Sequence, residues 1–194
     1  YRWELLENRN LTLQHLDTNE VLKTVRLGIE CGRLPEDTGT DVPAILGKFG
    51  LLKDGVLNNA AAVLFGKHED MEYPQCLLRL ARFKGTDKTV FMDSQRIQGN
   101  FFQLLNAAMA FIFKHLSLSG TTDTLEREEH LTIPYKAIRE GVLNSLTHRS
   151  YKEAGGSVGI AIYDDRVEIE NPGTFPPDWN AEKMRSEHES KPQN

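Results

Sequence analysis

The sequence lacks any apolar run long enough to cross a membrane, which takes roughly 20 consecutive apolar residues. The longest candidate, residues 101–118, is interrupted by Gln103, Asn106, Lys114 and His115. Its apolar side chains recur at helical spacing, which predicts a buried core helix at about residues 100–118. The sequence therefore argues against a membrane-spanning protein, and we expect no membrane partner.

Cysteine is also scarce, and basic residues do not outnumber acidic ones. Cys31 and Cys76 are the only cysteines, they lie far apart, and they match no metal or redox spacing. Reduced thiols in a cytoplasmic protein are the expected state. The net charge of -5, from 23 basic and 28 acidic residues, argues against a domain that coats nucleic acid with its whole surface.

The chain lacks an initiator methionine and a signal peptide, and residues 187–194 lack a helix stop. We therefore expect an internal to C-terminal fragment of a longer protein. Its 194 residues suffice for one domain or two small ones. We expect an arm or linker at 1–16, a small helical connecting subdomain at 17–72, and an α/β module, truncated at its C-terminus, at 73–194.

The small subdomain carries two helix signals and one hairpin signal. Asp17 precedes an apolar stripe that ends before Gly32. A second helix is predicted at about 42–49, and Asp54 and Gly55 predict a hairpin turn. Two helices and a hairpin are typical of a winged-helix unit, which would bind DNA, or of a connecting subdomain. We favour the connecting subdomain because no Lys/Arg cluster marks a recognition helix.

A second hairpin is predicted at 76–97, where two strand-like runs flank the turn 84–88. Four cations lie on this hairpin: Arg79, Arg82, Lys84 and Lys88. They could contact nucleic-acid phosphates without reading bases. Alternatively, they form a solvated face or protect an edge strand by their charge.

Residues 134–149 predict a helix with two different sides. Its apolar stripe consists of Ile138, Val142 and Leu146. About half a turn away, a polar line has the same spacing and consists of Glu140, Asn144 and His148. Arg149 follows directly.

Those residue types can act on a nucleotide. A carboxylate can deprotonate water, an amide oxygen suits magnesium, which also takes phosphate oxygens, and His148 or Arg149 could contact phosphates. A polar line is equally typical of an ordinary solvent-facing side, and Glu-x-x-x-Asn also occurs at Glu4 and Asn8. Spacing alone therefore leaves both interpretations open.

Two short strands are predicted next, at about 158–162 and 167–170. Asn171 continues the inward parity of the second strand, so we expect its side chain on the core side. Pro172 and Gly173 then break the strand. Asn171 could contact a ligand there, or cap the turn that Asn-Pro-Gly forms readily.

Four stretches, taken in order, resemble the bacterial RecG-like transcriptional regulator family. Residues 133–151 resemble that family's N-box helix, and residues 162–173 resemble its hairpin with a terminal Asn-Pro-Gly. Residues 50–66 and 79–87 resemble its middle region. The resemblance covers most of the chain from about residue 17.

Such proteins join an N-terminal AlbA-like, Schlafen-type DNA-binding domain to a divergent GHKL-type ATPase module. The resemblance therefore implies that DNA is bound by a domain missing from this chain. In GHKL ATPases the N-box glutamate activates water and the asparagine binds magnesium, which implies these roles for Glu140 and Asn144. A later Asp-x-Gly recognises adenine, and Asn171-Pro172-Gly173 occupies that place.

Two departures weaken the implied site. Asn171 stands where true ATPases have Asp, although an amide oxygen can still accept one hydrogen bond. Phe175 replaces a glycine of that motif and leaves less room for close backbone approach. The lid over the phosphates is expected past Asn194, so neither ATP nor Mg2+ should bind this chain tightly. Because the sequence has no P-loop, we do not expect helicase motor activity.

The sequence therefore predicts an α+β fold, a two-layer α/β sandwich resembling a divergent, incomplete GHKL ATPase module, preceded by the helical subdomain. The expected function is a regulatory, ATP-binding module of a DNA-binding transcriptional regulator, with any nucleotide between the 134–149 helix and the sheet. The expected catalytic base is Glu140, and the expected nucleotide-contacting residues are Asn144, His148, Arg149, Asn171 and Gly173. One alternative is a non-enzymatic scaffold for interaction or self-association. Another is direct DNA binding by residues 17–66 or the cationic hairpin.

Overall fold

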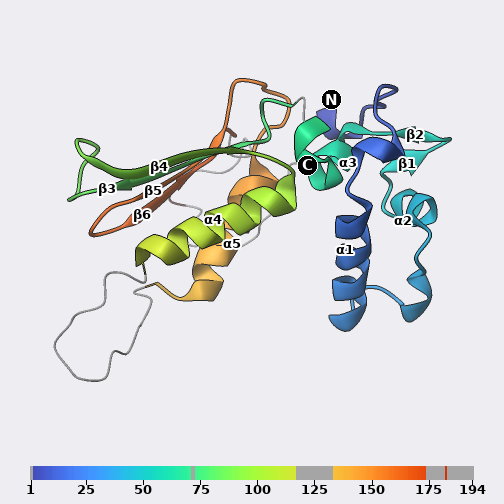
Figure 1. Cartoon of the computed structure of the whole chain (residues 1–194), viewed down its shortest axis with the longest axis horizontal. Coiled ribbons are helices and arrows are strands. Elements are labelled where there is room, and N and C mark those ends of the chain that lie inside the picture. The colour runs from blue at the N-terminus through green and yellow to red at the C-terminus, as the bar shows by residue number, and fades with distance from the viewer. Residues whose placement is uncertain (1, 71–72, 117–132, 174–181, 183–194) are drawn as a thin grey trace.

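The computed structural model describes residues 2–70, 73–116, 133–173 and 182 of the chain. Two parts with separate hydrophobic clusters make up these residues (Figure 1). The first part, which precedes residue 70, is mostly helical. The second combines a four-stranded sheet with two helices, and this second part carries most of the predicted site residues.

The helical part begins with two capped helices. Helix α1 (Thr18–Glu30) follows Asp17, whose side chain accepts from the Glu20 backbone N–H at 3.1 Å. Helix α2 (Val42–Lys48) is capped in the same way by Asp41. Such caps satisfy backbone donors that have no partner inside the helix. Both helices lie close to the ranges expected from the sequence.

A tight hairpin and a third helix complete this part. Strands β1 (Leu52–Lys53) and β2 (Val56–Leu57) pair antiparallel across Asp54 and Gly55. These two residues have positive φ values of 49° and 79°, which the predicted Asp-Gly turn favours. Helix α3 (Asn59–Phe65) was not predicted from the sequence.

The segment before residue 17 packs onto the helical part. It contains two short 3-10 helices, η1 (Trp3–Leu5) and η2 (Leu13–His15). The Asn8 backbone N–H donates to the Leu57 carbonyl at 2.8 Å. Leu16 is 1% exposed and belongs to the core of the helical part. These residues are therefore held by the same core as the three helices.

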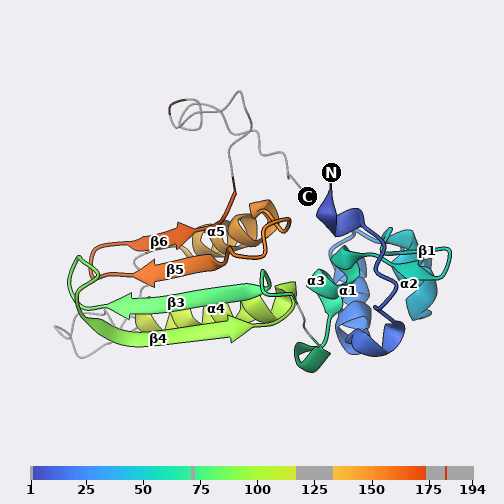
Figure 2. The same cartoon turned by 90° about the horizontal axis from the view of Figure 1, so that it is seen from above.

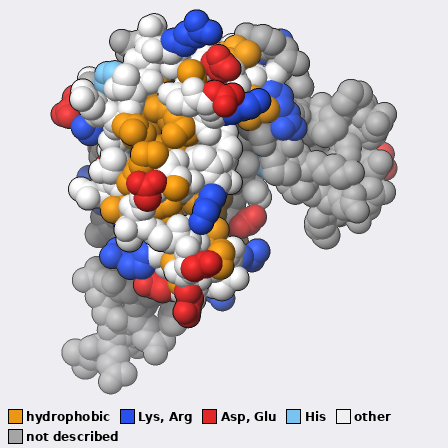
Figure 3. Space-filling model, turned by 90° about the vertical axis from the view of Figure 1, so that its right-hand side faces the viewer, with side chains coloured by type: hydrophobic (Ala, Val, Ile, Leu, Met, Phe, Trp, Pro, Cys, Tyr) orange, Lys and Arg blue, Asp and Glu red, His pale blue; other side chains and the backbone are white. Residues whose placement is uncertain are grey.

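A shallow groove of about 690 Å³ runs between α1 and residues 36–40. Its apolar lining comes from Leu22, Val25 and Ile29. On the face of the helical part turned to the viewer in Figure 3, basic and acidic side chains alternate around apolar ones. That face therefore lacks the single-sign basic patch that a DNA-contacting surface needs.

The second part is a mixed sheet of four strands. They are β3 (Leu77–Phe83), β4 (Phe91–Gln98), β5 (Val158–Ile162) and β6 (Val167–Glu170). The spatial order is β4-β3-β5-β6, with β3 and β5 parallel and the other two pairs antiparallel. Figure 2 shows the sheet with both helices behind it.

Helices α4 (Phe101–Leu116) and α5 (Tyr135–His148) pack on one face of this sheet. Leu78 and Leu80 of β3 and Val142 and Leu146 of α5 are at most 1% exposed. Burying a side chain of this size contributes about 1.5–3 kcal/mol. The predicted two-layer α/β sandwich is confirmed. No described helix is long and apolar enough to cross a membrane.

An aromatic cluster joins the two parts. The indole of Trp3 is stacked on the ring of Tyr151, with ring centres 6.5 Å apart, and meets Tyr73 edge-on at 5.1 Å. The side chain of Asn59 in α3 donates to the Trp3 carbonyl at 3.0 Å. The residues just after α5 therefore contact the helical part through the N-terminal segment.

Replacing Leu146 with alanine should lower the free energy of unfolding by about 2–5 kcal/mol, because removing a fully buried leucine leaves a cavity. Urea unfolding followed by circular dichroism measures the change. Leu27→Ala is the matched control, since Leu27 is 48% exposed and should lose less than about 1 kcal/mol. Equal losses in the two variants would contradict the core described above.

Candidate functional site

The C-terminal end of α5 meets the turn that follows β6. The Ser150 backbone N–H donates to the Pro172 carbonyl at 2.6 Å. Earlier along the helix, α5 packs over β6, since a Cβ built at Gly141 would lie 3.2 Å from Cδ1 of Ile169. Helix and strand therefore run side by side and end at the same edge of the sandwich.

The polar line of α5 leads to that edge. Glu140 and Asn144 are exposed, and the half-buried His148 is the last residue of the helix. A Cβ at Gly173 would lie only 3.1 Å from the His148 carbonyl oxygen. The structure thus brings His148 and Gly173 together, with Asn144 about one turn and Glu140 about two turns back along the helix.

The opposite side of α5 fills the space between the helix and the sheet. Ile138, Val142 and Leu146 are 5%, 0% and 0% exposed and share one core cluster with the strands. The expectation that a nucleotide lies between the 134–149 helix and the sheet is therefore wrong, because close-packed side chains occupy that space. A ligand of α5 must approach its exposed line and its C-terminal end.

Asn171 lies one residue past β6, and its side chain is exposed. Pairing with β5 ends at Glu170 and the chain then turns towards α5 at Pro172, which leaves Asn171 exposed at the edge of the sandwich and not buried in the core. A Cβ at Gly173 would lie 3.5 Å from the Asn171 amide nitrogen. The amide therefore lies beside Gly173 and is accessible. Phe175, the second departure from the family pattern, lies outside the described residues.

Arg149 points into the protein. Its side chain is 1% exposed, and its guanidinium donates to the carbonyls of Gln75 and Gly156, the latter at 2.9 Å. The guanidinium carbon also lies 4.8 Å from the ring centre of Tyr151. Burial lowers the pKa of Arg149 from its ordinary value. We assign Arg149 to the framework, where it ties the end of α5 to the segments that precede β3 and β5.

Cys76 lies in the same buried cluster as Tyr151. Burial raises the pKa of its thiol to about 12, so the thiol stays protonated and unreactive at neutral pH. Cys31 is exposed, and both cysteines are free.

The structure separates the four hairpin cations, Arg79, Arg82, Lys84 and Lys88. Arg82 lies on the helix side of the sheet, with its guanidinium 2.5 Å from Asp164. Lys88 lies 4.0 Å from Glu170. Arg79 and Lys84 are exposed. The four cations do not form one patch, because neighbouring residues of a strand face opposite sides of the sheet.

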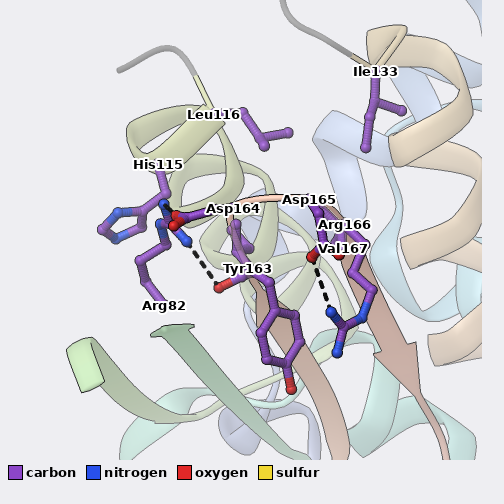
Figure 4. Close-up of a pocket in the computed structure, with 10 residues that line it drawn as sticks. Arg82, His115, Leu116, Ile133, Tyr163, Asp164, Asp165, Arg166 and Val167 are labelled. Carbon is purple, nitrogen blue, oxygen red and sulfur yellow. Dashed lines mark hydrogen bonds and ion pairs between the residues drawn. The ribbon is translucent and has the colours of Figure 1, made fainter. Parts of the chain in front are cut away.

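A pocket of about 500 Å³ lies at the other end of the sandwich, where α4 ends and β5 turns into β6 (Figure 4). The hydrogen bond from Arg82 holds the pKa of the Asp164 carboxyl below its usual range. Asp165 and Arg166 pair at 2.9 Å. These lining charges are matched in pairs, and no single sequence motif indicated the pocket because distant segments form it.

Among the described residues, no group of three or more His, Cys, Asp and Glu is placed to hold a metal ion. Magnesium at Asn144 would take its other ligands from phosphate oxygens and water, as is usual for nucleotide-bound Mg2+. The exposed Asn144 amide fits this arrangement. Gly173 also fits a bound nucleotide, since a side chain at this position would crowd the end of α5.

Comparison with known proteins supports an ATPase-type module. A family model described as "Putative ATP-dependent DNA helicase recG C-terminal" matches residues 155–194, which is less than half of the chain. No curated protein matches. A crystal structure of the DIP2311 protein from Corynebacterium diphtheriae has a similar fold, with a TM-score of 0.70 and 15% identity. The likeness covers 98% of this chain, which spans 37% of that chain's length.

Replacing Gly156 with alanine should destabilise the protein by about 1–3 kcal/mol. The new Cβ would lie 2.6 Å from Cβ and Cγ of Pro172, so the turn beside α5 must move. Thermal unfolding measures the loss. Gly155→Ala is the control, since nothing lies within 4 Å of a Cβ there, and its melting temperature should equal or slightly exceed that of the wild type. Identical melting of both variants would refute the close contact with Pro172.

Proposed function

We propose that this chain is a regulatory, ATP-binding module of a DNA-binding transcriptional regulator. The observation that carries this proposal is the convergence of the exposed α5 line with the Asn171–Gly173 turn at one edge of the sandwich. That turn lies inside the stretch matched by the ATPase-type family model. The closeness of Gly173 to the His148 carbonyl supports the proposal, because a side chain at position 173 would crowd that edge.

Each residue at this edge has a proposed role. Asn144 offers its amide oxygen to magnesium, and His148, between Asn144 and Gly173, faces the phosphates. Asn171 accepts a hydrogen bond from the adenine amino group. Glu140 accepts a proton from the attacking water in a hydrolysing form of the protein. ATP with Mg2+ supplies the reactive phosphoanhydride when it is bound.

In this proposal the protein works in the cytoplasm, and DNA is bound by a domain outside this chain. Helicase activity, which is part of the matched family's description, is not carried over, because the sequence contains no P-loop. The mixed charges on the face shown in Figure 3 give no support to DNA binding there. The proposal therefore keeps nucleotide sensing and DNA contact in different parts of the protein.

A scaffold without nucleotide is the second candidate. It would keep the sandwich and serve interaction or self-association. Asn171 favours it, since a neutral amide binds the adenine amino group less strongly than the carboxylate found in true ATPases. Calorimetry with Mg-ATP separates the two candidates.

Mg-ATP should bind weakly to the 194-residue chain and more tightly to a version that continues past Asn194. Asn144→Ala should weaken binding by at least about tenfold, because it removes the proposed magnesium ligand. Asn106→Ala, which removes an exposed amide from α4, is the control and should leave affinity unchanged. No binding by a folded longer version would favour the scaffold.

If the longer version hydrolyses ATP, Glu140→Ala should reduce turnover by about 10²- to 10⁴-fold while sparing nucleotide affinity. Phosphate release under saturating Mg-ATP measures turnover, and calorimetry on the same variant measures affinity. Retained turnover would remove Glu140 as the base. A parallel loss of affinity would instead indicate that the carboxylate helps to hold the nucleotide.

A further inference from the structure

The sheet has a second face that no described helix covers. Figure 2 looks onto this face, with α4 and α5 behind the strands. Leu78 and Leu80 face the helices, so Arg79 and Ala81, which alternate with them along β3, face the open side. The strand register then fixes which residues of β4, β5 and β6 share that side.

Two arginines lie directly opposite each other on this open face. Arg79 of β3 pairs in register with Arg96 of β4, and both are exposed. Like charges placed opposite each other across a sheet cost stability. Neither arginine forms an ion pair with another described residue. Their juxtaposition therefore favours an anionic partner.

The acidic residues of the same face are already matched. Glu168 of β6 accepts from Arg166 at 2.7 Å, and Glu170 lies 4.0 Å from Lys88. No acid among the described residues forms an ion pair with Arg79 or Arg96, and the acid in their own row, Glu170, lies beyond Gly159 on β6. This face is locally basic although the chain as a whole carries a net charge of -5.

The surface beside the arginines is shallow and unobstructed. Gly159 is the register partner of Arg79 on β5, and a Cβ there would meet nothing within 4 Å. On β4, β3 and β5 the next row holds only small side chains, Ser94, Ala81 and Ala161, and Glu168 ends the row on β6. A partner can therefore reach the backbone level of the sheet without displacing side chains.

An exposed aromatic ring lies on the same face. Phe91 pairs in register with Phe83, its ring centre lies 4.5 Å from that of Phe83, and its side chain is 61% exposed. Phe83 lies four positions after Arg79 on β3, or about 13 Å away at roughly 3.3 Å per residue. Sheets that bind single strands combine such a ring, for stacking a base, with cations for the phosphates.

We propose that the open face of the sheet binds single-stranded nucleic acid, with Arg79 and Arg96 on phosphates and Phe91 stacked on a base. This goes beyond the ATP-binding proposal and does not depend on it, since α5 lies on the other face. It also differs from binding by the cationic hairpin, because Arg82 points away and Arg96 and Phe91 contribute. Recognition rests on charge and stacking and therefore has little sequence preference.

Fluorescence anisotropy with a short labelled oligothymidylate tests this directly on the 194-residue chain. Binding should weaken steeply with salt. The double variant Arg79→Ser/Arg96→Ser should make the slope of log affinity against log salt shallower by about 1.4, since each single-strand phosphate contact contributes about 0.7. Phe91→Ala should weaken binding by at least about fivefold at fixed salt.

The control variants remove the same kinds of side chain, two arginines or one phenylalanine, from other parts of the protein. Arg26→Ser/Arg33→Ser removes two exposed charges from the helical part, and Phe113→Ala removes a ring that is 42% exposed on α4. Both should bind like the wild type, and circular dichroism should show every variant folded. Absence of wild-type binding at low salt, or equal losses in test and control variants, would overturn the proposal. Displacement by polyglutamate as readily as by unlabelled oligothymidylate would instead assign the face to an acidic protein partner.

Discussion

The burial of one stripe of α5 against the sheet is the constraint on which the other features depend. Val142 and Leu146 have no exposed surface, and their packing fixes the rotation of the helix about its axis. Once that rotation is fixed, 3.6-residue periodicity sends Glu140 and Asn144 outwards. The same packing fills the space where we expected a nucleotide. A helix can bury its apolar stripe or line a cavity with it, and here it buries the stripe.

Elements whose signal is local were predictable from the sequence. Capping aspartates, the Asp-Gly turn and the 3.6-residue stripes located the major helices and the β1–β2 hairpin. Helix α3 was missed because its short, alanine-rich segment is buried on most sides and shows no amphipathic period. The parallel pairing of β3 with β5 joins residues about 80 positions apart. No local pattern encodes such a pairing, because it arises from the tertiary fold.

At the candidate site too, features with a local sequence signal were predictable, and features set by tertiary contacts were not. Helical spacing predicted the exposure of Glu140 and Asn144, but it did not predict where Arg149 points. Arginine is seldom fully buried, and the carbonyls of Gln75 and Gly156 that hold it lie outside the helix, the first of them 74 residues away in sequence. Strand parity did not predict that Asn171 would be exposed, because the paired strand ends at Glu170. The roles of these residues towards a nucleotide rest on the family resemblance and stay predictions.

The contacts beyond α5 indicate which part of the molecule a change at its C-terminal end would reach first. His148 borders Gly173, whereas Arg149 turns inward and lies against the Tyr151 ring. Tyr151 stacks on Trp3, whose carbonyl is held by Asn59 of α3. Energetic coupling needs such contiguous contacts, and these lead to the helical part. The open sheet face lies across the packed core from α5, so a shift at this end reaches it only if the whole sheet moves.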